Sequence, residues 1–158
     1  MQNLSVNDST YQTMDVGTGG AAPLFPSLSF YPRFLQVVYL SAGLAKRGAY
    51  TNDIWQEHSI RVLQALESVG VQIEVRGLEQ ITAVDGPVIF VGNHLSVMET
   101  VLLPSWILPY KPFTYVIKQS LLEVPIFKHV MGSIDPIAVT RTNPRADLKI
   151  VLEQGVER

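Results

Sequence analysis

The sequence predicts an α/β fold, because strand and helix patterns alternate along its second half. Val71, Ile73 and Val75 alternate with polar residues, as in a strand with one face in water. Residues 87–91 are apolar throughout, which is typical of a central strand covered on both faces. The 158 residues are 47% hydrophobic, which is enough for one modest core. We therefore expect one α/β unit with additional segments.

Two helices are predicted before these strands. The first begins at Pro32, a residue suited to the first turn of a helix, and ends near Lys46. The second begins at Thr51 or Asn52 and ends at Gly70. Along it, residues that suit a buried face repeat at helical spacing: Trp55, Ser59, Val62, Leu66 and Val69.

Further elements follow the apolar strand. The pattern predicts a helix at 97–108, a strand at 113–117, and a helix interrupted by Pro125. A strand at 137–140 and a helix capped by Asn143 complete the chain. Because such a helix normally leads to another parallel strand, we expect the chain to be a fragment of a larger sheet domain.

Three segments are expected on this basis. Residues 1–31 are expected to form a flexible leader, because most of this stretch is rich in Ser, Thr, Asn and Gly. Residues 32–70 form the two-helix segment, and residues 71–158 form the sheet with its flanking helices.

Composition excludes several classes of function. Twelve basic against fourteen acidic residues give a formal net charge of -2, which does not favour binding to a nucleic-acid backbone. The absence of cysteine excludes disulfides and thiolate chemistry. No apolar run reaches the roughly 20 residues that span a bilayer, and the start of the chain lacks the features of a secretory signal.

The chemical centre of the sequence is the turn that contains Asn93 and His94. It follows the predicted central strand, where open α/β sheets place ligand-binding groups. His94 can act as a base if Glu99 fixes its tautomer. Five helical positions separate two side chains by about 140°, so His94 must lie in the turn while Glu99 reaches back from the first turns of the helix. The alternative is a polar turn followed by a helix whose acidic residue faces water.

The block 93–99, Asn-His-Leu-Ser-Val-Met-Glu, resembles the Asn-His-x4-Asp block of the glycerolipid and lysophospholipid acyltransferases, the 1-acylglycerol-3-phosphate acyltransferase superfamily. Lys118, Leu121 and Pro125, followed by the run 135–141, resemble the second block of that family. The resemblance covers residues 71–158. Glu99 replaces the usual aspartate, and the third and fourth blocks of the family do not occur in this chain.

This resemblance implies a partial acyltransferase-like sheet, preceded by the helix pair, and a set of functional residues. His94 is the expected general base and Glu99 its supporting acid, while Asn93, Lys118 and Arg141 are expected to bind the acceptor. For Lys118 and Arg141, the alternative is an ordinary solvated residue at a strand end. His58 and His129 lie outside both blocks, and we expect them to be exposed or partly packed, without a catalytic role.

The implied reaction transfers an acyl group from acyl carrier protein or coenzyme A to the free hydroxyl of a lysophospholipid. The expected acceptor is 1-acylglycerol 3-phosphate, which gives phosphatidate, and no metal or other cofactor is implied. The enzyme is expected to be peripheral on the cytoplasmic side of a membrane, with the helix pair in contact with lipid; alternatively, this pair only covers the sheet. The rival hypothesis is a non-catalytic, membrane-associating or lipid-binding fragment.

Overall fold

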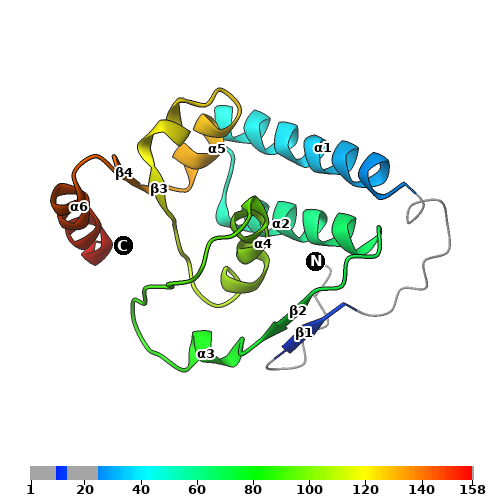
Figure 1. Ribbon diagram of the computed structural model, residues 1–158, viewed down its shortest axis with the longest axis horizontal. Coiled ribbons are helices and arrows are strands. Elements are labelled where there is room, and N and C mark those ends of the chain that lie inside the picture. The colour runs from blue at the N-terminus through cyan, green and yellow to red at the C-terminus, as the bar shows by residue number, and fades with distance from the viewer. Residues whose placement is uncertain (1–9, 14–24, 158) are drawn as a thin grey trace.

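The structure is a computed structural model that describes residues 10–13 and 25–157 (Figure 1). Its helices are α1 Pro26–Lys46, α2 Asn52–Glu67, α3 Glu79–Thr82, α4 Val97–Ile107, α5 Phe127–Ser133 and α6 Pro144–Val156, with a 3-10 helix, η1, at Gln119–Glu123. Its strands are β1 Thr10–Gln12, β2 Glu74–Arg76, β3 Val116–Lys118 and β4 Ile137–Val139. Helices and strands alternate along the second half, so the α/β composition predicted from the sequence is confirmed.

Within residues 10–13 and 25–157, the strands form two separate pairs instead of one sheet. β1 and β2 are antiparallel, with Thr10 opposite Arg76. β3 and β4 are parallel, with Val116 opposite Ile137 and Lys118 opposite Val139. In Figure 1 the two pairs lie at opposite sides of α4.

The prediction of a central strand at 87–91 is wrong. In Figure 1 the chain leaves α3 and reaches α4 as an extended segment without a strand arrow, and Ile89 and Val91 are 81% and 91% exposed. A strand needs neighbours that satisfy its backbone N–H and C=O groups. Within the described residues β3 and β4 pair only with each other, so this segment has no strand beside it.

The start of the chain also differs from the prediction. Thr10–Gln12, within the expected flexible leader, forms β1, and its Tyr11 is buried and donates a hydrogen bond to Glu67. Helix α1 begins at Pro26 and not at Pro32, which lies inside the helix. Residues 1–9 and 14–24 of the predicted leader lie outside the described residues.

The second helix matches its predicted start. The Thr51 hydroxyl caps α2 by accepting a hydrogen bond from the N–H of Ile54, at 3.4 Å. The helix ends at Glu67, just before Gly70, which has a φ of 90°. The predicted inner stripe is confirmed, because its first three members are buried and the last two are partly buried against the core: Trp55, Ser59, Val62, Leu66 and Val69.

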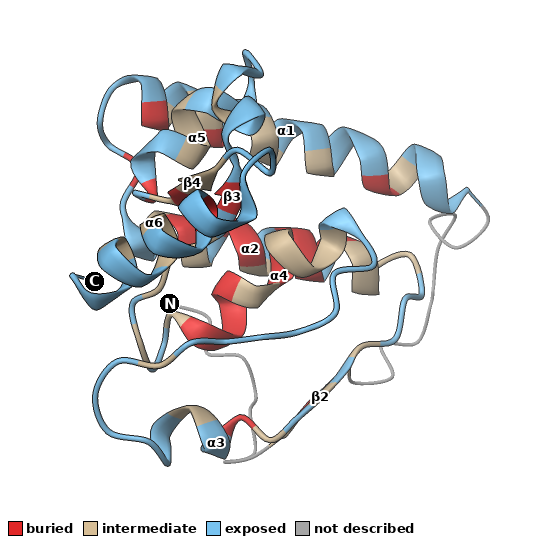
Figure 2. Ribbon diagram, turned by 60° about the vertical axis from the view of Figure 1, so that its left-hand side comes forward, coloured by how far each residue is buried: buried red, intermediate tan, exposed pale blue. Residues whose placement is uncertain are grey.

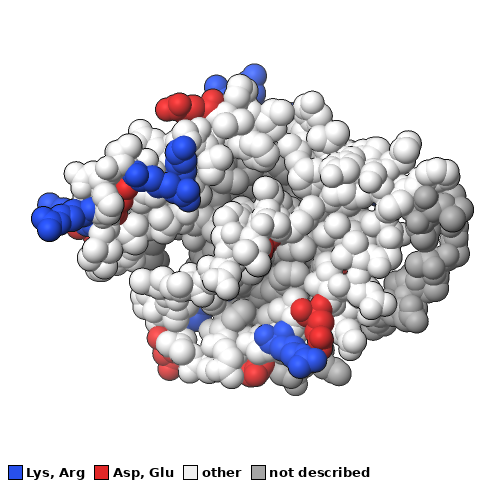
Figure 3. Space-filling model, in the orientation of Figure 1, with Lys and Arg blue, Asp and Glu red and all other residues white. Residues whose placement is uncertain are grey.

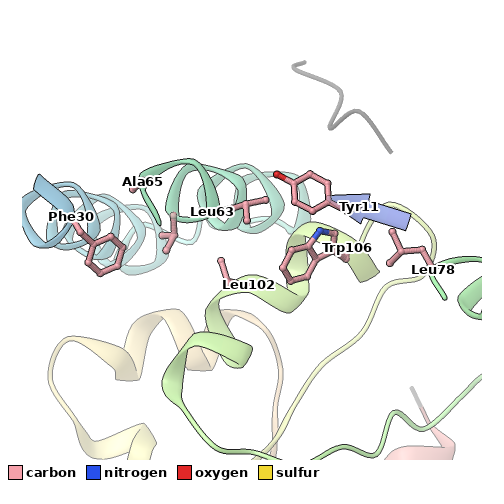
Figure 4. Packing of buried hydrophobic residues seen from close by; sticks show 8 residues of the cluster. Tyr11, Phe30, Leu63, Ala65, Leu78, Leu102 and Trp106 are labelled. Carbon is pink, nitrogen blue, oxygen red and sulfur yellow. The ribbon is translucent and has the colours of Figure 1, made fainter. Parts of the chain in front are cut away.

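The main core lies between α2 and α4 (Figures 2 and 4). Leu63 is fully buried, and Leu102 and Trp106 of α4 belong to the same buried cluster. Tyr11 and Trp106 contact each other with ring centroids 6.1 Å apart, which attaches the β1–β2 pair to this core. A second cluster around Trp55 joins the helices to the β3–β4 pair; its buried members are Ala45, Tyr50, Trp55 and Ile134.

Pro104 interrupts the backbone hydrogen bonds of α4, because it has no N–H to donate to the carbonyl of Thr100. That carbonyl instead accepts a hydrogen bond from the Tyr115 hydroxyl, at 3.0 Å. One residue later, the Ser105 N–H donates to the Ser59 hydroxyl of α2, at 3.1 Å, and this hydroxyl donates to the Val101 carbonyl, at 2.6 Å. The polar groups near the proline are therefore satisfied by α2 and by the chain before β3.

No helix in the described part of the chain combines the length and the hydropathy needed to cross a bilayer.

The expectation that His58 is exposed or only partly packed is wrong, since this residue is buried between α1 and α2. Its Nδ1 lies 2.6 Å from the Ser41 hydroxyl oxygen. The centroids of the His58 and Tyr50 rings are 5.8 Å apart.

This burial predicts a stability that depends on pH. Desolvation lowers the pKa of His58, the Arg61 guanidinium lowers it further, and Glu57 opposes the change. In the unfolded chain, histidine has a pKa of about 6.5. Below that pH, the unfolded chain therefore binds more protons than the folded chain does. The stability is full above about pH 6.5 and is lost as the pH falls towards the folded pKa. We expect His58→Gln to reduce the difference in urea midpoint between pH of about 7.5 and 5.5, whereas His129→Gln keeps it. An unchanged difference in the His58 variant would contradict this assignment.

Candidate active site

The first turn of α4 holds the predicted histidine and acid together. Ser96 has an extended backbone and is the N-cap, and its hydroxyl accepts a hydrogen bond from the Met98 N–H, at 3.1 Å. Glu99 completes a capping box, because its carboxylate accepts hydrogen bonds from the Ser96 N–H, at 2.9 and 3.0 Å. It also accepts one from the Leu95 N–H, at 3.2 Å. The Glu99 side chain therefore folds back over the turn that contains His94.

His94 and Glu99 are in contact. The Nδ1 atom of His94 lies 3.3 Å from Oε2 of Glu99, and the two side chains are 64% and 35% exposed. His94 lies before the helix and Glu99 lies in its first turn, which is the arrangement that helix geometry requires. With Nδ1 directed at the carboxylate, Nε2 is the ring nitrogen that remains for a proton from a substrate.

Glu99 is held in its charged form. Partial burial by itself would raise the pKa of its carboxyl, but the N–H groups of Ser96 and Leu95 and the Ser96 hydroxyl lower it to below the usual range. The positive end of α4 favours the same negative charge. A carboxylate at this position can stabilise a neighbouring imidazolium.

The two predicted basic residues belong to other elements, at one end of the β3–β4 pair. Lys118 is the last residue of β3, opposite Val139, and Arg141 follows Val139 by two residues. Both side chains are exposed. Within the described residues, no hydrogen bond or ion pair joins either of them to His94 or Glu99. Asn93, beside His94, is also exposed.

The His94 turn was expected at the carboxyl end of a central sheet strand. This placement is not observed, because the segment 87–91 is unpaired within the described residues. A hollow between α1 and α2 is lined by other side chains, and none of the predicted site residues is among them: Arg33, Gln36, Val37, Leu40, Arg61, Gln64 and Ala65.

Sequence reasoning missed two residues that shape these turns. Ser96 belongs to the pattern Ser-x-x-Glu, which is a recognisable capping signal. Asp147 accepts hydrogen bonds from the backbone of Thr140 and Arg141, and no local pattern in the sequence indicates this contact.

Comparison with known proteins identifies the family. The sequence model of an acyltransferase family, described as "Acyltransferase", matches residues 72–158. The chain belongs to this acyltransferase family. The acyltransferase superfamily predicted from the two motif blocks is thus confirmed. The matched segment contains the His94 turn, the β3–β4 pair and the turn at Arg141.

A relative has a more specific name. The acyltransferase chain is 36% identical over 88 residues to the 1-acyl-sn-glycerol-3-phosphate acyltransferase of Pseudomonas aeruginosa. The match covers 56% of this chain and 32% of the relative, so the chain spans about a third of the length of that protein. No solved structure matches this chain.

The cap of α4 can be tested by Ser96→Ala. Loss of an N-cap hydroxyl costs about 1 kcal/mol of the free energy of unfolding, because an N–H of the first helical turn loses its acceptor. We expect a lower urea midpoint and faster amide exchange in the first turn of α4. Ser120→Ala, at an exposed position of η1, is the control and should change neither. Equal behaviour of the two variants would show that the Ser96 cap contributes nothing measurable.

Proposed function

We propose that this chain is part of an enzyme that transfers an acyl group from a thioester to the free hydroxyl of a lysophospholipid. The observation that carries the proposal is the His94–Glu99 contact, which lies within the segment matched by the acyltransferase family. The name of the Pseudomonas relative supports 1-acylglycerol 3-phosphate as the acceptor and phosphatidate as the product.

In the proposed mechanism, His94 is the general base. The Glu99 carboxylate accepts a hydrogen bond from Nδ1–H, which leaves Nε2 unprotonated and able to take the proton of the acceptor hydroxyl. The hydroxyl oxygen then attacks the thioester carbonyl directly, and the C–S bond breaks without an acyl-enzyme. The departing thiolate takes the proton back from the His94 imidazolium and leaves as the thiol. Glu99 stabilises the imidazolium that forms, as the acid of a catalytic triad does. The distance of 3.3 Å in the free chain leaves room for this contact to shorten when substrate binds.

The remaining predicted residues are assigned to the acceptor. Arg141 can bind a phosphate through two parallel N–H donors, and Lys118 at the neighbouring strand end adds a second positive charge. Asn93 is assigned to the acceptor next to His94. Coenzyme A or acyl carrier protein supplies the thioester, which is the only co-substrate that the proposal requires.

Exposed apolar side chains beside His94 support a lipidic substrate. Ile89 and Val91 precede the histidine, and Leu95 and Val97 follow it, and all four are exposed. Removal of such side chains from water lowers the free energy by about 25 cal/mol per Å² of buried apolar area. An acyl chain lying across this turn would cover them.

We also propose that α1 contacts the membrane surface. Its inner face packs on α2, while its outer face exposes large side chains at helical spacing: Leu28, Tyr31, Leu35 and Tyr39. The helix contains Arg33 and Lys46 but no acidic residue, and Arg47 follows it. Figure 3 shows a largely uncharged surface over α1. Apolar and aromatic side chains with nearby cations suit the interface of an anionic bilayer, which supports the proposal that the enzyme binds the cytoplasmic face of a membrane.

The same exposed surfaces favour a second candidate function, a lipid-binding chain without turnover. The two functions differ in their products. Formation of acylated product supports the enzyme, whereas vesicle binding without product, both in this chain and in any longer protein that contains it, supports the second candidate.

Removal of the base tests the mechanism. We expect His94→Ala to lower the rate of acyl transfer to lysophosphatidate by about 10²- to 10⁴-fold, because the hydroxyl loses its proton acceptor. The control is His129→Ala, at a position that matches no residue of either motif block, which should keep the rate. The rate is followed as thiol release from acyl-coenzyme A and from acyl carrier protein. Unchanged turnover in the His94 variant excludes this mechanism.

Vesicle sedimentation tests the membrane contact. The double variant Leu28→Ser, Leu35→Ser should bind phosphatidylglycerol vesicles roughly tenfold more weakly or worse, because two apolar side chains no longer leave water. Leu148 and Leu152 of α6 are similarly exposed, so their double serine variant is the matched control. Equal loss in both double variants would show that α1 is not the contacting surface.

A further inference from the structure

The turn between β4 and α6 contains a backbone conformation that residues other than glycine rarely adopt. Arg141 has a φ of 63°, in the left-handed region. Residues held there are usually constrained by their surroundings, and such constraints are common at functional sites. The residue in this conformation is the one assigned above to the acceptor phosphate.

A single carboxylate holds this turn. Oδ1 of Asp147 accepts hydrogen bonds from the Thr140 N–H, at 2.8 Å, and from the Thr140 hydroxyl, at 3.0 Å. Oδ2 accepts one from the Arg141 N–H, at 2.7 Å. The Thr140 hydroxyl also accepts a hydrogen bond from the Thr142 N–H, at 3.2 Å, so the network extends across the whole turn.

The start of α6 directs Asp147 at the turn. Asn143 caps the helix by accepting a hydrogen bond from the Ala146 N–H, at 3.2 Å, and Pro144 occupies its first turn. Asp147 is the only residue of α6 that is buried, at 9% exposure. The Thr140 N–H lowers the pKa of its carboxyl to below the usual range, desolvation opposes this, and the Arg141 N–H lowers it further.

The charge of Asp147 is directed at backbone groups and not at the guanidinium of Arg141. Within the described residues, Arg141 makes no ion pair, and its side chain is exposed. An acidic residue so close in sequence could have neutralised this arginine. Because both carboxylate oxygens are occupied by N–H and hydroxyl donors of the turn, the guanidinium remains available to an anion.

We propose that Asp147 is a positioning residue of the acceptor phosphate site, which holds the left-handed turn from which Arg141 binds the phosphate. This inference rests on the function proposed above, because it takes the phosphate-binding role of Arg141 from there. It adds a residue outside both motif blocks to the site.

The test measures binding of hexanoyl lysophosphatidate, with monohexanoylglycerol as the ligand that lacks the phosphate. Arg141→Gln should weaken binding of the phosphate ligand by on the order of tenfold, because a charged hydrogen-bonding group is lost. Asp147→Asn keeps the size of the side chain but turns an N–H₂ group towards backbone N–H donors, and it should cause a comparable loss. Glu153→Gln, which removes an exposed carboxylate of the same helix, should bind as the unmodified chain does.

The double variant separates positioning from a general structural effect. If Asp147 acts through Arg141, Asp147→Asn causes no further loss when Arg141 is already Gln, and neither change affects binding of monohexanoylglycerol. Conversely, a full additional loss in the double variant, or an equal loss for both ligands, would mean that Asp147 only stabilises the fold, and the proposal is overturned.

The remaining outcomes distinguish this proposal from the one on which it rests. If Arg141→Gln weakens phosphate binding and Asp147→Asn does not, the positioning role is wrong while the phosphate role of Arg141 stands. If Arg141→Gln has no effect, or if the unmodified chain does not distinguish the two ligands, the phosphate role of Arg141 itself is wrong. In that case the positioning role is overturned with it.

Discussion

The arrangement of the molecule depends on the interruption of α4 at Pro104. The proline removes one backbone donor from the helix, and the Thr100 carbonyl finds a replacement in the hydroxyl of Tyr115. The Ser59 hydroxyl satisfies the neighbouring groups from the side of α2. Because buried polar groups are costly to leave unpaired, these contacts determine how α4 lies against both neighbours. The helix whose N-terminal turn holds His94 and Glu99 is thereby attached to α2 and to the chain before β3.

The chain uses one physical device at both of its candidate functional turns. In each case a carboxylate from the first turns of a helix accepts hydrogen bonds from backbone N–H groups of the preceding turn. Glu99 does this for the turn that contains His94, and Asp147 does it for the turn that contains Arg141. The positive end of a helix favours both carboxylates. The difference lies in the neighbour: Glu99 also contacts the His94 ring, whereas Arg141 forms no ion pair in the described part of the chain.

Helices were predicted more accurately than strands, for a physical reason. The apolar stripe of α2 and the caps at Thr51 and Asn143 depend on residues a few positions apart, so the sequence contains the whole signal. A strand depends on a partner elsewhere in the chain. The apolar run 87–91 has the composition of a central strand, yet it lies extended and exposed in the described structure, because no neighbouring strand satisfies its backbone. The strand β1 was missed for the converse reason, since its partner β2 lies about sixty residues further along the chain.

The sequence by itself determined the family and the local geometry of the histidine and its acid. Their spacing required His94 to precede the helix and Glu99 to lie on it, because five positions on one helix would separate the two side chains by about 140°. Only the tertiary structure decided the burial of His58 between α1 and α2, the unpaired state of the segment 87–91 within the described residues, and the contact of Asp147 with the Arg141 turn. These depend on how separate segments pack, and packing is decided by long-range burial and hydrogen bonding that no local pattern encodes.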